Sequence, residues 1–259
     1  MTRAAQPAVT AFAVAMIALG ILAVIYGDFA LVWQPVAAWV PGRTALAYSS
    51  GVLMICGGAG LLFRRTAAAS IRILFPYIVV WFLLKVPAVL VAPQVETVWL
   101  GIGELGILLT GGWVLFAKRA ELPAGSPLAW LTNDRAIYVT QKVFGAALIP
   151  IGLSHLVYVK ATADFVPGWL PYRVGWAYFT GAAQIAAGVG VLFGIFPRLA
   201  AMAEAAMIGL FTLLVWAPAI AAAPKARLPW TAFFISWVFG ASAWVVAQSI
   251  ATKRSTTRA

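Results

Sequence analysis

The sequence predicts an all-α membrane protein whose eight transmembrane helices form two tandem, parallel four-helix bundles. Three observations support this prediction: a composition too apolar for a soluble globule, eight continuous apolar windows, and a self-similarity that recurs after about half the chain.

The composition places the chain in a membrane. Of its 259 residues, 63% are hydrophobic and 10% are charged, and the mean hydropathy is +0.96. The net charge of +11 comes from basic residues that stand singly or in pairs between apolar runs, so we expect a lipid bilayer and no nucleic acid as partner. The single cysteine excludes an intrachain disulfide and a cysteine metal site.

The apolar windows set the number of spans. A helix that crosses ~30 Å of hydrocarbon needs roughly 20 apolar residues. Eight windows meet this requirement, at residues 8–26, 45–63, 70–92, 96–117, 137–159, 174–195, 199–222 and 229–250. Basic residues in the short connections divide eleven to five between the two sides, which predicts that both termini are cytoplasmic. The side with eleven includes Arg3, Lys253, Arg254 and Arg258.

The self-similarity sets the domain organisation. A shift of about 131 positions relates the two halves; it falls to 126 at the Val-Pro-Gly triplets, at 40–42 and 166–168, and the match continues to the end of the chain. We therefore expect a first repeat at 1–117, a cytoplasmic linker at 118–135 and a second repeat at 136–259. Because each half has an even number of spans, both halves have the same orientation. Asn133 and Asp134 are candidate N-caps for the fifth span.

The first connection of each half carries an acidic residue, aromatic side chains and a Val-Pro-Gly turn. We expect residues 28–43 and 160–173 to fold as hairpins at the outer interface. Their aromatic side chains would lie at headgroup level, namely Trp33, Trp39, Trp169 and Tyr172. Interfacial anchoring without any ligand is the plainer interpretation of these loops.

Five ionisable residues fall inside apolar windows, namely Lys85, Glu104, Lys142, His155 and Glu204. Each costs roughly 2.5 to 3.5 kcal/mol at the centre of a membrane, so each requires a partner or a function. Lys85 and Glu104 lie at similar depths on two helices joined by a tight connection, which predicts a buried ion pair. Lys142 and Glu204 are candidates for a second pair. In both cases the alternative is a lysine that extends to the interface.

His155 is the only histidine in the chain. It is interpreted either as a hydrogen-bonded packing residue or as a group that titrates or binds a polar headgroup. No ligand spacing supports a metal site, and no Ser, His and Asp set supports hydrolysis.

Three stretches of the second half carry a family resemblance, namely GLSHLVY, VPGW and GAAQIAAGVGVLFGIFPRLAAM. They resemble the DoxX-like family of bacterial integral membrane proteins, a duplicated four-helix unit in this chain. By position, His155 matches the family histidine, Gln184 stands where the family usually has glutamate, and Arg198 matches the arginine that opens the third helix. The first half has Ala23 and Met54 where the second half has His155 and Gln184.

The resemblance implies a multi-pass protein of the bacterial inner membrane, linked to membrane redox complexes. We expect a subunit with no catalytic centre and no metal of its own, which binds a quinone or lipid-like molecule or docks a redox protein. A transporter of small solutes or lipids, and a structural or assembly protein, are the alternatives. The predicted ligand pocket lies on the outer side of the second half and is framed by His155, Asp164, Arg173 and Gln184.

Overall fold

The computed structural model describes residues 6–251, and this part of the chain contains helices and no strand. The basic residues Arg3, Lys253, Arg254 and Arg258, and the C-terminal Ala259, lie outside the described residues. Eight of the described helical segments are long and apolar enough to cross a membrane. This agrees with the prediction of an all-α membrane protein.

The first half contains four long helices. They are α1 (Pro7–Tyr26), α2 (Arg43–Leu61), α3 (Arg64–Val91) and α4 (Glu96–Arg119). The predicted windows agree with these helices to within a few residues, except that α3 begins six residues before the window that predicted it. The reason is that the helix continues through the polar turn at 64–69, which hydropathy alone assigns to a connection.

The second half contains more breaks. After a short 3₁₀ turn η1 (Ala129–Leu131) come α5 (Asp134–Val157), α6 (Val159–Phe165) and α7 (Arg173–Phe193). The seventh span is divided into α8 (Pro197–Phe211), a π-helical segment η2 (Thr212–Trp216) and α9 (Ala217–Ala222), and α10 (Arg227–Ser249) completes the fold. The N-cap prediction is confirmed for Asn133, whose side chain accepts a hydrogen bond of 2.8 Å from the amide of Ala136.

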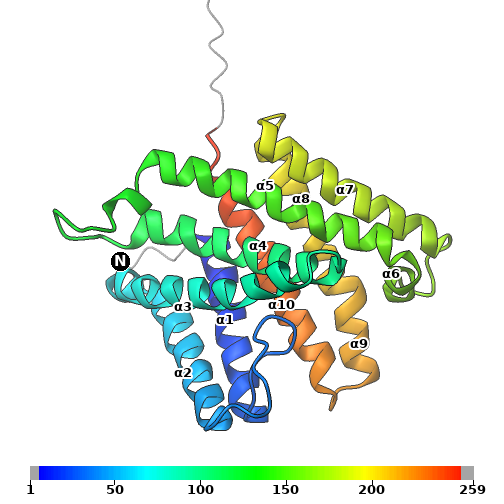
Figure 1. Cartoon of the computed structure of the whole chain (residues 1–259), viewed down its shortest axis with the longest axis horizontal. Coiled ribbons are helices and arrows are strands. Elements are labelled where there is room, and N and C mark those ends of the chain that lie inside the picture. The colour runs from blue at the N-terminus through cyan, green and yellow to red at the C-terminus, as the bar shows by residue number, and fades with distance from the viewer. Residues whose placement is uncertain (1–5, 252–259) are drawn as a thin grey trace, which may run out of the picture.

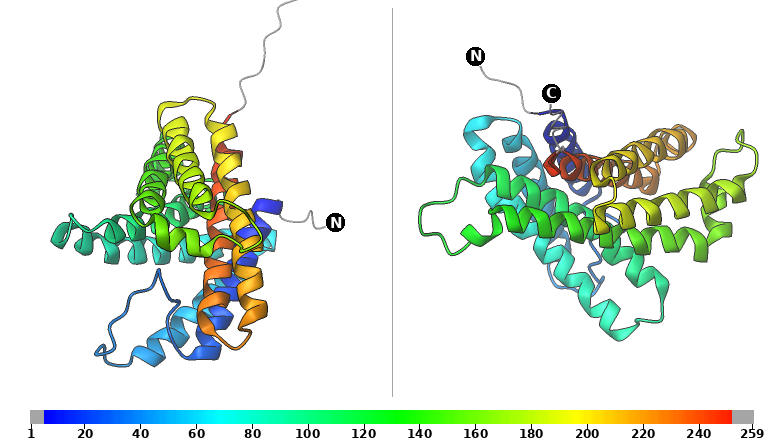
Figure 2. Two further views of the ribbon diagram at one scale, coloured as in Figure 1. Left: turned by 90° about the vertical axis from the view of Figure 1, so that its right-hand side faces the viewer. Right: turned by 90° about the horizontal axis from the view of Figure 1, so that it is seen from above.

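The two halves interlock, and they do not stand side by side as two closed bundles. Each half forms two hairpins, but α10 packs on α1, α4 packs on α5, and α4 and α10 contact each other. The fourth helix of each half therefore covers the first helix of the other half. Figure 1 shows α1, α2 and α10 running down the view while α5 and α7 run across it, and Figure 2 shows the same steep crossing from two other directions. The predicted pair of parallel bundles is thus not the arrangement of the helices.

Glycines permit the closest of these helix contacts. A Cβ on Gly152 would lie 2.6 Å from the carbonyl oxygen of Gly181, and a Cβ on Gly145 would lie 2.7 Å from that of Gly188. No side chain fits at these distances, so α5 and α7 approach backbone to backbone. The same approach joins α1 to α2, where a Cβ on Gly20 would lie 2.5 Å from the oxygen of Gly51.

Several side-chain contacts occur in both halves at positions that the sequence shift relates. The indole of Trp99 donates to the carbonyl of Pro93 at 2.8 Å, and that of Trp230 donates to the carbonyl of Pro224 at 2.9 Å. Likewise, the guanidinium at the start of the second helix of each half donates to a valine carbonyl seven residues earlier. These bonds join Arg43 to Val36 at 3.2 Å and Arg173 to Val166 at 3.0 Å.

Candidate functional site

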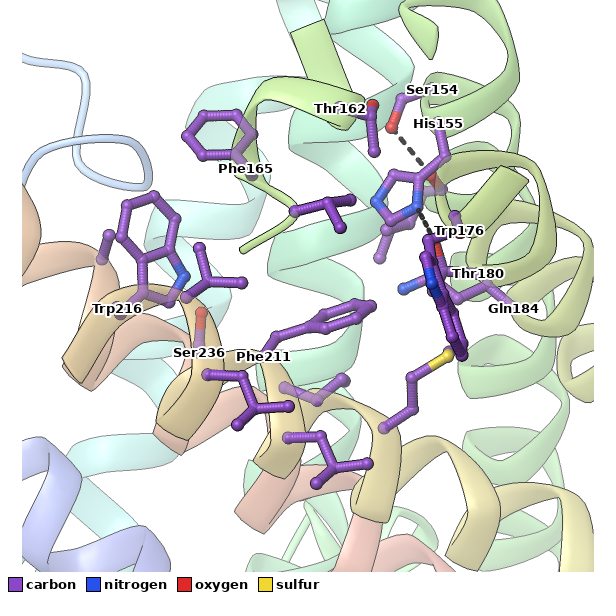
Figure 3. A pocket seen from close by; sticks show the side chains of 18 of the residues that line it. Ser154, His155, Thr162, Phe165, Trp176, Thr180, Gln184, Phe211, Trp216 and Ser236 are labelled. Atoms are coloured by element: carbon purple, nitrogen blue, oxygen red, sulfur yellow. Dashed lines mark hydrogen bonds between the residues drawn. The ribbon is translucent and has the colours of Figure 1, made fainter. Parts of the chain in front are cut away.

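A cavity of about 780 Å³ lies in the second half of the described residues. It is enclosed by α5, α6, α7, the α8–η2 segment and α10, and residues of α4 close it from the first half. Figure 3 shows the side chains that face it. The lining is mostly apolar and aromatic, with a few polar groups, which is the composition typical of a site for a small amphipathic molecule.

The π-helical segment η2 shapes one wall of this cavity. One extra residue in the turn rotates the following side chains, and Leu214, Val215 and Trp216 all line the cavity. The hydroxyl of Thr212 donates to the carbonyl of Ile208 at 2.9 Å, which adds a second hydrogen bond to that carbonyl where the helix changes its winding. The equivalent stretch of α3 stays α-helical. The break is therefore specific to the half that contains the cavity.

His155 faces the cavity from α5. Its Nδ1 lies 3.0 Å from the hydroxyl oxygen of Thr180, and that hydroxyl lies 3.0 Å from the carbonyl of Trp176. Because the threonine proton is used on the carbonyl, we assign the imidazole proton to Nδ1, which leaves Nε2 as an acceptor. Figure 3 shows this second ring nitrogen turned toward the cavity, with Phe211 beside the ring at 6.1 Å between centroids.

Gln184 lines the cavity from α7 and is only 3% exposed. Its amide donates to Glu204 Oε1 at 3.3 Å, and Glu204, on α8, is 1% exposed. Gln184 Oε1 and Glu204 Oε2 have no hydrogen-bond partner among the described residues. The two side chains thus form a buried polar pair, in which Gln184 lines the cavity and Glu204 lies behind it. Sequence reasoning missed this pair because it joined Glu204 to Lys142.

The predicted Lys142–Glu204 ion pair is not formed. The ammonium of Lys142 donates to the carbonyls of Val191 and Leu192, at 3.0 and 2.7 Å, and lies 4.9 Å from the centre of the Tyr138 ring. These carbonyls belong to the last turn of α7, where a helix presents unpaired oxygens and the negative end of its dipole. A pattern of residue types does not show which backbone carbonyls lie near a lysine, and for this reason the sequence analysis paired Lys142 with the carboxylate of Glu204.

The predicted Lys85–Glu104 ion pair is also not formed within the described structure. The ammonium of Lys85 donates to the carbonyl oxygen of Val32 at 3.0 Å, and no salt bridge joins it to Glu104. The physical reason is the connection at 28–42, which folds inward and brings its backbone to the lysine. Glu104 instead lines the cavity of the second half. It is therefore a residue of the site.

Asp164 and Arg173 lie beside the cavity and not in its lining. Arg173 donates to the carbonyls of Asp164 and Val166, at 2.9 and 3.0 Å, while its distance to the Asp164 carboxylate is 4.0 Å. The turn that these bonds hold contributes Val166 and Pro167 to the lining. Of the four predicted pocket residues, the structure therefore places His155 and Gln184 in the wall and the other two in the support of the turn.

In the first half the corresponding space is filled by the chain itself. The connection after α1 inserts Trp33, which is 1% exposed, against the rings of Tyr77 and Trp81. Gln34 follows it into the core and donates to the hydroxyl of Ser50 at 3.1 Å. The prediction that Trp33 lies at headgroup level is therefore wrong, whereas the other three aromatic side chains of the two loops are exposed, namely Trp39, Trp169 and Tyr172.

A three-residue ion cluster anchors this inserted connection. Asp28 pairs with Arg43 at 2.5 Å and with Arg227 at 2.8 Å, and Arg227 also donates to the carbonyl of Phe29. Burial alone raises the pKa of the Asp28 carboxyl, but the hydrogen bonds from Arg227 and Arg43 outweigh this effect and hold the pKa below its ordinary value. Arg227 begins α10, so the cluster fastens the connection of the first half to the second half.

Comparison with known proteins gives one match, and it lies in the second half of the chain. A family model described as a domain of unknown function (DUF8561) matches residues 144–242. The match runs from α5 into α10 and contains His155, Gln184 and Glu204, whereas Glu104 lies outside it. No curated protein and no solved structure matches the chain.

Proposed function

We propose that this chain is a membrane-embedded binding subunit that holds a quinone or another lipid-like small molecule in the cavity of its second half, without a catalytic centre of its own. The observation that carries the proposal is the cavity of about 780 Å³, whose apolar and aromatic walls carry a small number of polar groups. Its volume falls within the range of roughly 300 to 1,000 Å³ that is usual for small-molecule sites. Docking of a redox protein at the same face belongs to this proposal.

The proposal includes a duplicated, DoxX-like origin for the two halves. The paired contacts of Trp99 and Trp230, and of Arg43 and Arg173, support it, because related positions make the same hydrogen bonds to related carbonyls. On this view one copy kept an open site and the other lost it. The localisation that goes with the proposal is the bacterial inner membrane with both termini cytoplasmic.

This topology is tested by reporter fusions in the central linker. Alkaline phosphatase fused at Ser126 is expected to be inactive, and a fusion at Lys225, between α9 and α10, is expected to be active. An active fusion at Ser126 would show that the linker is external and would overturn the orientation.

The binding proposal is tested by native mass spectrometry of protein extracted in a gentle detergent. We expect a small molecule to copurify with the wild type, and a Ser236→Trp variant, which places an indole inside the cavity, to lose it. The matched control is Ala206→Trp on the exposed face of α8, which leaves the cavity unchanged. Full occupancy in both Ser236→Trp and the His155→Ala, Gln184→Ala double variant would exclude this cavity as the site.

A transporter is the second candidate, and η2 is the observation that favours it. Non-helical or irregular backbone inside a membrane is tolerated where it borders a cavity, and transporters use such breaks to move one helix segment against another. Substrate-dependent flux across liposomes that contain the purified protein would favour this function. Retention of a ligand without flux favours the binding subunit.

A further inference from the structure

The charge of the cavity differs in sign from the charge of the chain. The protein has a net charge of +11, yet no lysine and no arginine occurs among the described residues that line the cavity. Glu104 is the single acidic residue in that lining. The cavity therefore presents one carboxyl group, the imidazole of His155 and no ammonium or guanidinium group to its contents.

Glu104 has no hydrogen bond and no ion pair with any described residue, and the structure gives it no partner inside the protein. The nearest cation, Lys85, is an electrostatic neighbour, but its ammonium is held by the carbonyl of Val32. A carboxylate without a partner at this depth is costly, and a cation that entered the cavity would relieve that cost.

Aromatic rings surround the space in which such a cation would lie. Phe165 and Trp216 are in contact at 5.4 Å between centroids, and Trp176 and Phe211 face them across the cavity (Figure 3). The face of an aromatic ring attracts a positive charge, most strongly where water is excluded. A half-buried carboxylate together with several rings forms a site that suits an organic cation better than a neutral or anionic molecule of the same size.

We propose that the cavity selects a lipophilic organic cation, such as a quaternary ammonium or phosphonium compound or a protonated hydrophobic amine, with Glu104 as its counter-ion. This inference rests on the proposed function, because it specifies the ligand of the same cavity: a cationic lipid-like molecule, in preference to a neutral quinone. The inorganic cations of the medium do not meet the description, since the walls offer rings and methyl groups in place of the oxygen cage that such ions require. Glu104 comes from the first half, so the site is complete only when the two halves interlock.

Lys85 has a defined role in this scheme. Its ammonium lies close enough to Glu104 to weaken the field of the carboxylate without neutralising it in a salt bridge. Lys85 is thus an internal competitor of the ligand. Removal of its charge by Lys85→Met should strengthen the binding of a cation, whereas removal of the carboxylate by Glu104→Gln should weaken it.

The experiment compares tetraphenylphosphonium with tetraphenylborate, two ions of nearly the same size and shape and of opposite charge, and with neutral triphenylphosphine oxide. Binding to the full-length protein in detergent is measured by isothermal calorimetry. We expect tetraphenylphosphonium to bind at least about tenfold more tightly than the other two compounds, to lose about tenfold in Glu104→Gln and to gain severalfold in Lys85→Met. Ser236→Trp should abolish binding of all three.

The outcomes separate this inference from the function on which it rests. Equal affinity for the three compounds, all abolished by Ser236→Trp, would overturn the cation selectivity and leave the binding function intact. No binding of any compound to the wild type would overturn both. Unchanged phosphonium affinity in Glu104→Gln would also overturn the inference, and because binding of the neutral compound reports a folded cavity, a misfolded variant is recognised by the loss of that signal.

Discussion

The connections that follow the first helix of each half take different paths. Residues 28–42 turn into the protein, where Trp33 packs against Tyr77 and Trp81 of α3 and Gln34 bonds to Ser50 of α2. Residues 158–172 instead form α6 and an outer turn, and the space beneath them stays open as the cavity. The difference teaches that the connection of the first half closes the space beside it, whereas the connection of the second half leaves a cavity.

The polar side chains of the two halves differ in the same way as the two connections. Ser50 and Thr180 occupy related positions, but Ser50 is bonded to the internal residues Gln34 and Tyr77, whereas Thr180 orients His155 toward the cavity. These polar groups of the first half are thus bonded to one another. Around the cavity of the second half, His155 Nε2 and the carboxyl of Glu104, which α4 of the first half contributes, remain without a protein partner among the described residues.

The largest loss of stability should come from removing the buried Trp33 side chain. Trp33→Ala leaves a void among Tyr77 and Trp81 and should lower the free energy of unfolding by about 3 to 5 kcal/mol. The matched control is Trp169→Ala in the second connection, where the side chain is 70% exposed and the expected change is within about 0.5 kcal/mol. Thermal unfolding in one detergent compares the two, and equal losses would contradict the assigned difference between the loops.

A smaller loss is expected when the ion cluster at Asp28 is broken. Asp28→Asn keeps the shape but removes the charge that Arg43 and Arg227 share, and it should cost about 1 to 2 kcal/mol at neutral pH, after allowance for partial exposure to solvent. The same method applies, with Asp164→Asn as the control, because the Asp164 side chain is 84% exposed and 4.0 Å from its arginine.

The cluster also predicts a pH dependence. Because the pKa of Asp28 is lower in the folded protein than the ordinary value of 3.8, the carboxylate contributes stability at pH values above 3.8. That contribution is lost as the pH falls through the lowered folded pKa. The difference in melting temperature between wild type and Asp28→Asn should therefore be constant from pH 7 to about 5 and should shrink toward the acid limit; a difference that grows on acidification would have the wrong sign.

The relation of Lys85 to Glu104 should give a still smaller effect. Lys85→Met removes the hydrogen bond to Val32, with an expected loss of about 1 kcal/mol. Because the two side chains are electrostatic neighbours but form no salt bridge, the Lys85→Met, Glu104→Gln double-mutant cycle should show a coupling of about 0.5 to 1 kcal/mol, well below the ~3 to 5 kcal/mol typical of breaking a buried ion pair. If the double variant recovered most of the stability lost in the single variants, the result would support the Lys85–Glu104 ion pair predicted from the sequence.

The smallest stability change is expected for Thr180→Val, which removes the hydroxyl that fixes the His155 ring. We expect a loss of about 0.5 to 1 kcal/mol. Since His155 is the only histidine, the nitrogen NMR spectrum of labelled imidazole reports it alone. The wild type should show the Nδ1-protonated tautomer and the variant a mixture; the Nε2-protonated form in the wild type would contradict the assignment.

The sequence was sufficient for the helices and insufficient for their assembly. Long apolar runs located every span within the described residues, because hydrocarbon thickness imposes a minimum length. The capping role of Asn133 was predicted for a similar reason, since it depends on neighbours a few residues away. The exchange of α4 and α10 between the halves depends on contacts between distant segments, and nothing in a hydropathy pattern distinguishes it from two separate bundles.

The residues of the site were likewise predicted correctly only where short-range sequence patterns determine their positions. His155 and Gln184 were placed in a pocket from the sequence, and both line the cavity. Trp33 was misplaced because a tryptophan in a loop beside an acidic residue has the local pattern of an interfacial anchor. Glu104 was predicted to pair with Lys85 because the hairpin geometry brings the two residues to a similar depth. The carbonyl of Val32, which binds Lys85 instead, is placed there by the fold of the connection, and no residue type in the sequence predicts that fold.

The number of tetraphenylphosphonium ions bound per chain tests most directly whether one copy is open and the other closed. Native mass spectrometry of saturated protein should show one ion per wild-type chain and none in Ser236→Trp, because Trp33 and Gln34 occupy the space of the first half that corresponds to the cavity. Two ions per wild-type chain, or one ion that persists in Ser236→Trp, would contradict the account.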